Sequence, residues 1–313
     1  MSFTTEIKQE IGFNELKECC AKAELSALVQ LCSTLTISNK GMQLLIKTEN
    51  ATTAKRIWKM IKDRYQAQTE LSVIRKMNLK KNNIYVIRVF EKSKEILHDL
   101  GIYNEKGLQS HPPMSMISKD CCSRAYLAGA FMAAGSCNAP NKSNYHLEIA
   151  LTDEAHAKFI DRLMHKYHLP SKIVQRRKKW VIYLKAADKI ADLLKCVGAH
   201  ESLMKFESIR IDRDLLNSIT RLDNCELANE MKSLKAANKQ LDDIEIIEKS
   251  GQFDKQEVRI KEIMVLRKQF PELSLNELSY EYEKRTGVSM SKSGMKHRFA
   301  KIHDIANEIT EGR

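Results

Sequence analysis

The chain of 313 residues has no apolar run close to the roughly 20 residues that a membrane-spanning helix needs. Its first residues also lack the basic segment and apolar stretch of a secretory signal. We therefore expect a cytoplasmic protein with no membrane partner. No Gly-rich phosphate loop is present, and nothing in the pattern of Ser, His and Asp recommends a catalytic triad.

Metal-binding patterns are missing as well. The eight cysteines contain no CxxC pair, so we expect reduced thiols that are mostly buried in the fold. His165 and His168 lie three residues apart on a predicted helix, but no further ligands follow at matching spacing. Surface or partly buried histidines are the better interpretation, and we predict no metal site and no cofactor.

What the sequence does contain is a long repeat. Segments 19–35 and 121–137 match at an offset of 102, which pairs Cys19 with Cys121, Cys20 with Cys122, and Leu25 with Leu127. Solenoid repeats recur every 20–50 residues, so a unit of this length is of another kind. It predicts two similar half-domains that pack as a pseudo-dimer within one chain.

Hydrophobic periodicity predicts the same elements in both copies, in the order αββαββα. The elements located in the first copy are 15–33, 42–47, 52–65, 70–77, 84–90 and 93–100. Those located in the second copy are 124–134, 145–151, 154–167, 171–176, 180–185 and 188–197. A short helix over 2–11 precedes them. After about residue 212 the pattern is helical only, so the fold class is α+β followed by an all-α region.

Positive charge is concentrated in three stretches that contain no acidic residue, namely 71–90, 171–187 and 291–301. Their 15 basic residues exceed the net charge of +12, so the rest of the chain is net negative. Clustered base favours a polyanionic partner. The alternative is that these are solvated surfaces kept basic for solubility. The first two stretches fall in equivalent hairpins and give candidate partner-facing residues: Arg75, Lys76, Lys80, Lys81, Arg88, Arg176, Arg177, Lys178 and Lys179.

The third basic stretch opens the last helix. A capping box at Ser274 and Glu277 predicts a preceding helix that ends at Gly287, and Ser291 then caps the final helix. Two helices joined by a Gly-containing turn are typical of a helix-turn-helix. Lys296 and Arg298 can donate to guanine or phosphate. The alternative is a basic terminal helix in an ordinary bundle. The predicted recognition residues are Ser291, Lys292, Ser293, Met295, Lys296, His297, Arg298 and Lys301.

Residues 127–135, Leu-Ala-Gly-Ala-Phe-Met-Ala-Ala-Gly, resemble the signature of the LAGLIDADG homing endonucleases. The resemblance implies two helices packed through small residues, with two antiparallel sheets forming a saddle over DNA. In that family the eighth residue is a metal-holding catalytic aspartate. Here it is Cys32 in the first copy and Ala134 in the second, and neither is a carboxylate ligand for a hard cation. The resemblance therefore implies a non-catalytic remnant and no enzyme. The nearest acids, Glu148 and Asp153, lie on the next strand and at its exit.

A degenerate LAGLIDADG pair followed by a helix-turn-helix resembles the WhiA family of Gram-positive bacteria over essentially the whole chain. The most specific segments are 126–136, 145–149, 224–229 and 291–298. The resemblance implies a DNA-binding regulator, with a transcription-factor role, in cell division, chromosome segregation or sporulation. It implies double-stranded DNA as partner and association with the nucleoid. Another transcription regulator or RNA polymerase is a further candidate partner.

The expected organisation has five parts. They are 1–101 as the first LAGLIDADG-like half, 102–118 as a linker, 119–212 as the second half, 213–250 as a linker helix, and 251–313 as the helix-turn-helix domain. Two other functions stay open. One is a residual nuclease that uses displaced carboxylates, and the other is a saddle that binds protein in place of DNA.

Overall fold

The computed structural model describes residues 1–38, 41–75 and 83–312, which group into two compact units, 1–214 and 215–313. Three predicted saddle residues, Lys76, Lys80 and Lys81, lie outside the described residues. No described helix is both long and apolar enough to span a membrane.

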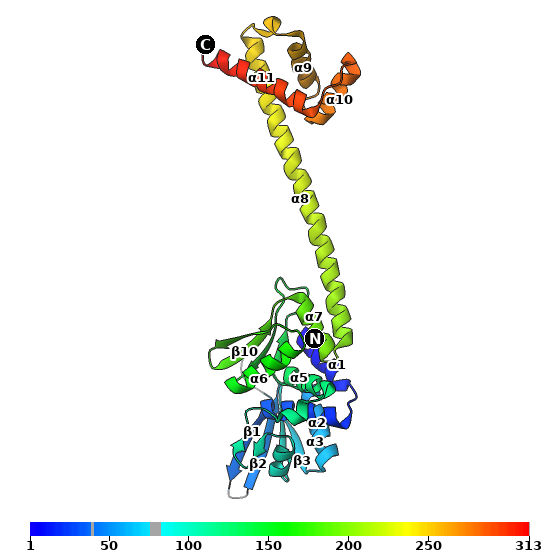
Figure 1. The fold of residues 1–313 in the computed structure, drawn as a ribbon, viewed down its shortest axis with the longest axis vertical. Helices are drawn as coiled ribbons and strands as arrows, with labels where there is room; N and C mark the ends of the chain where they lie inside the picture. Colours follow the sequence, from blue (N-terminus) through cyan, green and yellow to red (C-terminus); the bar gives the residue numbers. More distant parts are fainter. Residues whose placement is uncertain (39–40, 76–82, 313) are drawn as a thin grey trace. The chain divides into compact units, whose positions relative to one another are not determined.

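The first unit contains the predicted αββαββα order twice (Figure 1). The N-terminal helix α1 is Phe3–Phe13. The first copy comprises α2 Glu18–Cys32, β1 Ser33–Ser38, β2 Gly41–Thr48, α3 Ala51–Tyr65, β3 Thr69–Arg75, β4 Asn83–Val89 and α4 Ser93–Asp99. The second comprises α5 Asp120–Ala134, β7 Gly135–Cys137, β8 Leu147–Leu151, α6 Glu154–Lys166, β9 Lys172–Arg176, β10 Lys179–Leu184 and α7 Ala187–Cys196. Between the copies lie β5 Tyr103–Asn104, β6 Gly107–Leu108 and the 3₁₀ helix η1 Met114–Ile117.

Both copies build a four-stranded antiparallel sheet of the same topology. The strand orders are β1-β2-β4-β3 and β7-β8-β10-β9, so one of the two outer strands of each sheet, β3 or β9, is the first strand of the basic hairpin. The α+β class, with antiparallel sheets and a helical C-terminal region, is confirmed. Strands β1 and β7 were not located from the sequence. Strand β1 starts directly after α2 with no breaking residue between them, and β7 is only three residues long and begins with Gly135, a residue type that is uncommon inside strands.

Helices α2 and α5 pack against each other through small residues at the centre of the unit. A Cβ added at Gly129 would lie 2.5 Å from the backbone oxygen of Glu24 and 3.0 Å from the Cβ of Ala27. Both helices are buried along most of their length, which is why small and apolar residues fill them on more than one face. Core side chains such as Leu25, Leu28, Leu127 and Phe131 are at most 1% exposed.

The second unit, from residue 215, is helical and begins within helix α8, His200–Lys249. Helix α8 thus starts well before the predicted helix over 222–249, because no proline or glycine interrupts this stretch. After the 3₁₀ helix η2 Phe253–Lys255 come α9 Val258–Gln269, α10 Leu275–Thr286 and α11 Lys292–Thr310. The end of α8 and the three following helices share one apolar core. That core includes Ile244, Ile247, Ile260, Ile263, Met264, Leu278, Tyr282, Phe299 and Ile302.

Candidate nucleic-acid interface

Local capping and turn geometry shape the helix pair α10 and α11. The hydroxyl of Ser274 and the carboxylate of Glu277 form a complete capping box at the start of α10. Gly287 ends α10 with φ of +71°, a conformation that glycine adopts without strain, and its N–H donates to the carbonyl of Glu283 at 2.8 Å. Ser291 then caps α11 by accepting from the amide of Gly294 at 3.1 Å.

Helix α11 divides into an exposed polar face and a buried apolar face. Four predicted recognition residues, Lys292, Ser293, Lys296 and His297, are exposed, together with the cap Ser291, while Arg298 is half-buried. The exposed side chains at the start of α11 carry no acidic group, so this face is positively charged.

Met295 is a correction to the predicted recognition set. Its side chain is 0% exposed and belongs to the apolar core of the second unit. Met295, Phe299 and Ile302 follow helical spacing and share one face of α11. Met295 therefore packs the start of α11 against the core and is not on the surface that could contact DNA. The expectation that Phe299 and Ile302 face the core agrees with their burial.

Lys301 forms an ion pair away from the start of the helix. Its Nζ lies 2.9 Å from Oε1 of Glu257, which precedes helix α9. The hydrogen bond from Lys301, together with its charge, lowers the pKa of the Glu257 carboxyl. The charge of Lys301 is therefore partly neutralised by an acidic side chain, whereas Lys292 and Lys296 have no ion-pair partner among the residues that the structure describes.

A residue that sequence reasoning missed holds the loop in front of α10. Arg267 is 2% exposed, donates to the Gln240 side chain at 3.0 Å and to the carbonyl of Leu273 at 2.6 Å, and stacks 5.3 Å above the Phe299 ring. Burial lowers its pKa to about 10. An arginine in a helical sequence pattern normally indicates a solvent-exposed face. That Arg267 is buried and binds loop carbonyls becomes apparent only from the path of the 270–274 loop in the folded protein.

The basic hairpins of the two sheets occupy equivalent outer edges. Arg88 pairs with Glu70 at 3.6 Å, and Arg176 lies 3.8 Å from Glu148, which also contacts His146 at 2.9 Å. Glu148 is thus an ion-pair partner on the sheet. The other described saddle residues, Arg75, Arg177, Lys178 and Lys179, are exposed at the tips or edges of the hairpins.

The two degenerate catalytic positions line one open cavity. It has a volume of about 1200 Å³ and receives Cys32 from the end of α2 and Ala134 from the end of α5. Three lysines also line it, Lys8, Lys47 and Lys179. The sequence resemblance placed the two motif positions together, and the fold brings both to this cavity.

The side chains in the cavity do not fit a hard divalent cation held by the two helix ends. Burial raises the pKa of the Cys32 thiol to about 12, and Ala134 offers no ligand atom. Burial also lowers the pKa of Lys8 to about 8, and this ammonium interacts with Cys32 where the family's metal would need negative charge. Of the lining acids, Asp153 caps helix α6 by accepting from the amide of His156 at 2.8 Å. The other is Glu49, which follows strand β2.

Three family models match the chain in succession. They are the WhiA N-terminal LAGLIDADG-like domain over residues 18–103, the WhiA LAGLIDADG-like domain over 123–216, and the WhiA C-terminal HTH domain over 219–306. The chain belongs to the WhiA family. A protein named probable cell division protein WhiA, from Bacillus cereus, is 44% identical over 313 residues, which cover 100% of this chain and 98% of the relative. A Bacillus anthracis protein of that name matches equally.

A solved WhiA structure has the same fold. The crystal structure of full-length WhiA from Thermotoga maritima matches with a TM-score of 0.60 and 19% identity, covering 98% of this chain and 99% of the other. The three family models show the expected LAGLIDADG-like halves and the helix-turn-helix, and the solved structure shows the same fold. The roles of individual residues in binding stay predictions.

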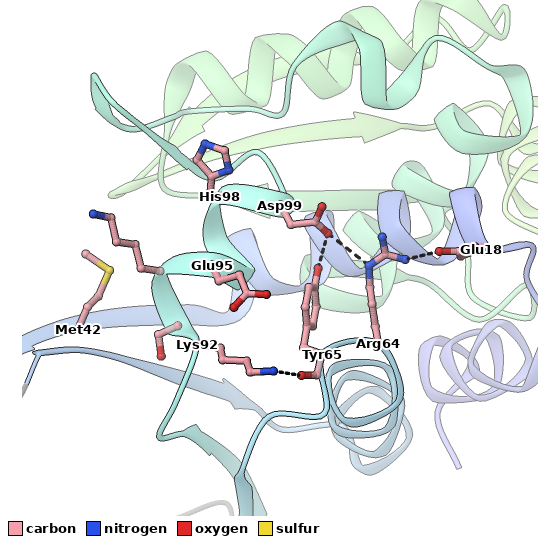
Figure 2. A pocket seen from close by; sticks show the side chains of 10 residues that line it. Glu18, Met42, Arg64, Tyr65, Lys92, Glu95, His98 and Asp99 are labelled. Atoms are coloured by element: carbon pink, nitrogen blue, oxygen red, sulfur yellow. Dashed lines mark hydrogen bonds and ion pairs between the residues drawn. The ribbon is translucent and has the colours of Figure 1, made fainter.

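A second cavity, of about 990 Å³, lies in the first WhiA half and is lined by charged side chains. Figure 2 shows Tyr65 and Arg64 directed toward Asp99, at 2.7 and 3.3 Å. Lys22 pairs with the other carboxylate oxygen of Asp99 at 2.5 Å. Although burial opposes it, hydrogen bonds from Lys22 and Tyr65 lower the pKa of Asp99. These groups satisfy one another across α2, α3 and α4, so the cavity wall is a structural network.

Proposed function

We propose that this chain is a DNA-binding regulator of cell division that reads double-stranded DNA with helix α11. The observation that carries the proposal is the exposed, acid-free start of α11, which presents Lys292, Ser293, Lys296 and His297 to solvent. The curated relatives are named as cell division proteins, and the matching C-terminal family model is an HTH domain. Transcriptional control is the expected output, because helix-turn-helix proteins bind operator sites through such a helix.

The geometry of α11 suits insertion of its first turns into a major groove. Met295 and Phe299 fix one face in the core, which leaves Lys296 and His297 on the opposite face. Lysine and arginine donate to the acceptor atoms of guanine, and good base contacts contribute about 1–3 kcal/mol each. Arg267 binds the loop in front of α10 through the Leu273 carbonyl and lies over the Phe299 ring of α11, so it contacts both parts of the helix pair.

The test has two steps. Duplexes that bind the purified protein are first selected from a randomised pool, and the affinity for the selected duplexes is then measured by a binding titration. We expect Lys296→Ala with Arg298→Ala to weaken binding about ten-fold or more and to flatten the salt dependence, since fewer counterions are released. The matched control is Lys249→Ala with Lys255→Ala, which removes the same charge from exposed positions in the same unit. Equal affinity of the Lys296/Arg298 variant and the control would show that α11 is not the reading helix.

The basic hairpins offer a second DNA-contacting surface, because Arg177, Lys178 and Lys179 project from the edge of one sheet and Lys179 also lines the central cavity. We expect phosphate contacts there, which carry no sequence preference. Replacing Arg176, Arg177, Lys178 and Lys179 with glutamate in the Lys296/Arg298 background should abolish the remaining salt-sensitive binding. Persistence of that binding would favour the protein-binding role for this surface.

We infer that the protein is not a nuclease. The support is the chemistry at the helix ends, where a high-pKa thiol, a methyl group and the Lys8 ammonium replace paired carboxylates. The test is incubation of supercoiled plasmid with the purified chain and Mg²⁺ or Mn²⁺. No nicking is expected. Nicking that disappears in Asp153→Asn would instead assign a reaction to the displaced carboxylates.

A further inference from the structure

Four cysteines that the function leaves unused come together at one point of the first unit. Cys19 and Cys20 lie in the first turn of α2, and Cys121 and Cys122 lie in the first turn of α5. All four sulfur atoms are within 4.8 Å of one another. Among the residues that the structure describes, no other group of three or more potential metal ligands converges in this way. We call these four residues the thiol cluster.

The spacing of the thiol cluster approaches that of a tetrahedral metal site. A tetrathiolate Zn²⁺ has Zn–S bonds of about 2.3 Å, which separates its sulfurs by about 3.8 Å. The Cys19–Cys20 and Cys121–Cys122 sulfurs are each 3.9 Å apart. The widest pair thus needs to close by only about 1 Å to reach that separation. A disulfide needs about 2.05 Å, which is much farther from the observed arrangement.

The position at two helix starts suits negatively charged sulfur. Neither α2 nor α5 has a side-chain cap at its N-terminus, since the cap positions are Lys17 and Lys119. The partial positive charge of a helix N-terminus stabilises thiolates. Hydrogen bonds led by that from Cys122, with the charge of Lys119, lower the pKa of Cys19.

Two cysteines of the thiol cluster are exposed to solvent and two are buried. Cys19 and Cys121 are exposed, whereas Cys20 and Cys122 are 5% and 3% exposed. Burial, together with the neighbouring thiols, raises the pKa of Cys20 to about 12 and that of Cys122 to about 11. Soft sulfur ligands select Zn²⁺ over Mg²⁺ or Ca²⁺.

We propose that the thiol cluster is a structural Zn²⁺ site that ties the two halves of the first unit together. On binding, the thiols that are still protonated release their protons, and four metal–sulfur bonds form with no change of oxidation state. The ligands come from positions 102 residues apart in the chain, so the ion links α2 to α5 where the halves meet. The site is separate from the DNA-reading helix, and its test does not depend on DNA binding.

The test uses the full chain, purified under reducing conditions from zinc-supplemented cells. We expect about one Zn²⁺ per chain by elemental analysis. After removal of zinc, added Co²⁺ should give the sulfur-to-cobalt charge-transfer bands and intense visible bands of a tetrahedral thiolate site. Both signals should disappear in Cys19→Ser with Cys121→Ser. The control Cys225→Ser changes an exposed cysteine on α8 and should keep both.

Zinc should also raise the midpoint of thermal unfolding of the first unit in the parent chain and not in the Cys19/Cys121 variant. Absence of Co²⁺ thiolate bands in the reduced parent chain would overturn the proposal, whatever the folding of the variants. So would full Co²⁺ binding in a folded Cys19→Ser with Cys121→Ser variant. The metal-free protein could instead contain a Cys19–Cys121 disulfide. If the protein still binds no Co²⁺ after that disulfide is reduced, the two cysteines are a redox pair and the zinc site is rejected.

Discussion

The two halves of the first unit share a backbone plan but satisfy their buried polar groups differently. At equivalent positions of α2 and α5, the first half has Glu24 and the second has Tyr126. Glu24 is 1% exposed and forms an ion pair with Arg56. Tyr126 is 0% exposed and bonds to His156 at 2.8 Å. One half therefore buries a charged pair where the other buries a neutral one.

A second pair of positions repeats this lesson. Asp99 ends helix α4 and gathers Lys22 and Tyr65, whereas the equivalent last residue of α7 is Cys196. Arg124, equivalent to Lys22, pairs within its own helix with Asp120 at 2.9 Å. These four charged side chains are partly exposed, between 29% and 58%, so each half meets the charge with a different local partner. Between the halves, the charged side chain and its partner therefore differ together, whereas the order and packing of the helices and strands are the same.

The largest effect is expected at the charged pair of the first half. Arg56→Ala leaves Glu24 buried without its partner and should lower the free energy of unfolding by about 3–5 kcal/mol, measured by urea denaturation. In the second half, counted from the N-caps Asn50 and Asp153, the equivalent position is Phe159. The neighbouring Lys158, which is 62% exposed and pairs with Glu154, serves as the control on helix α6. Lys158→Ala should change stability by less than about 0.5 kcal/mol.

The double variant Glu24→Met with Arg56→Met sharpens this test. It removes both charges together and should recover most of the stability, since no unpaired charge stays buried. A similar loss from Arg56→Ala and from the control Lys158→Ala would show that the loss does not come from leaving Glu24 buried without its partner.

The neutral pair of the second half predicts a pH dependence. Burial lowers the pKa of His156 to about 4, with Asp153 opposing this and His111 adding to it. The unfolded chain takes up this proton below about pH 6.5, while the folded chain resists it until about pH 4. Stability should thus be full above pH 6.5 and fall by about 2 kcal/mol between pH 7 and pH 5.

Urea midpoints at the two pH values measure this loss. The first half has Thr53 at the equivalent position, the third residue after the N-cap, and threonine does not titrate in this pH range. The first half therefore has no counterpart of this titration. His156→Gln should remove most of the pH-dependent loss. An unchanged pH profile in that variant would place the titrating group elsewhere.

The smallest effect concerns the interface that the halves share. Gly129 of α5 is equivalent to Ala27 of α2, and the two face each other. Gly129→Ala should cost about 1–3 kcal/mol through overpacking against the Glu24 carbonyl. The control Gly294→Ala adds a methyl in helix α11, where it would meet its nearest neighbour at 3.4 Å, and should cause no such loss.

Combining Gly129→Ala with Ala27→Gly should restore part of the stability, because it relieves the 3.0 Å contact but leaves the 2.5 Å contact with the backbone. Thermal or urea unfolding of the three variants distinguishes these cases. Full tolerance of Gly129→Ala would mean that the two helices are not held at this distance.

Much of the fold follows from local signals in the sequence. The repeat of Cys19 and Cys121, with the same run of periodic elements after each, predicts two αββαββα units, and capping residues such as Ser274 and Ser291 locate the last helices. Strand β1 was not located because it follows α2 without a break, and β7 was not located because it is short and begins with Gly135. The start of α8 at His200 escaped because helix propensity alone does not mark where a domain's last helix begins.

The sequence by itself determined the duplicated order, the degenerate motif positions at Cys32 and Ala134, and the basic start of α11, because periodicity, spacing and composition are local properties. Tertiary structure decided which side chains meet or disappear from the surface. It buried Met295, gave Arg267 its backbone partners, and brought Cys19 and Cys20 together with cysteines about a hundred residues away. Such contacts depend on how the helices within each unit pack, because side chains far apart in the chain meet only in the folded protein.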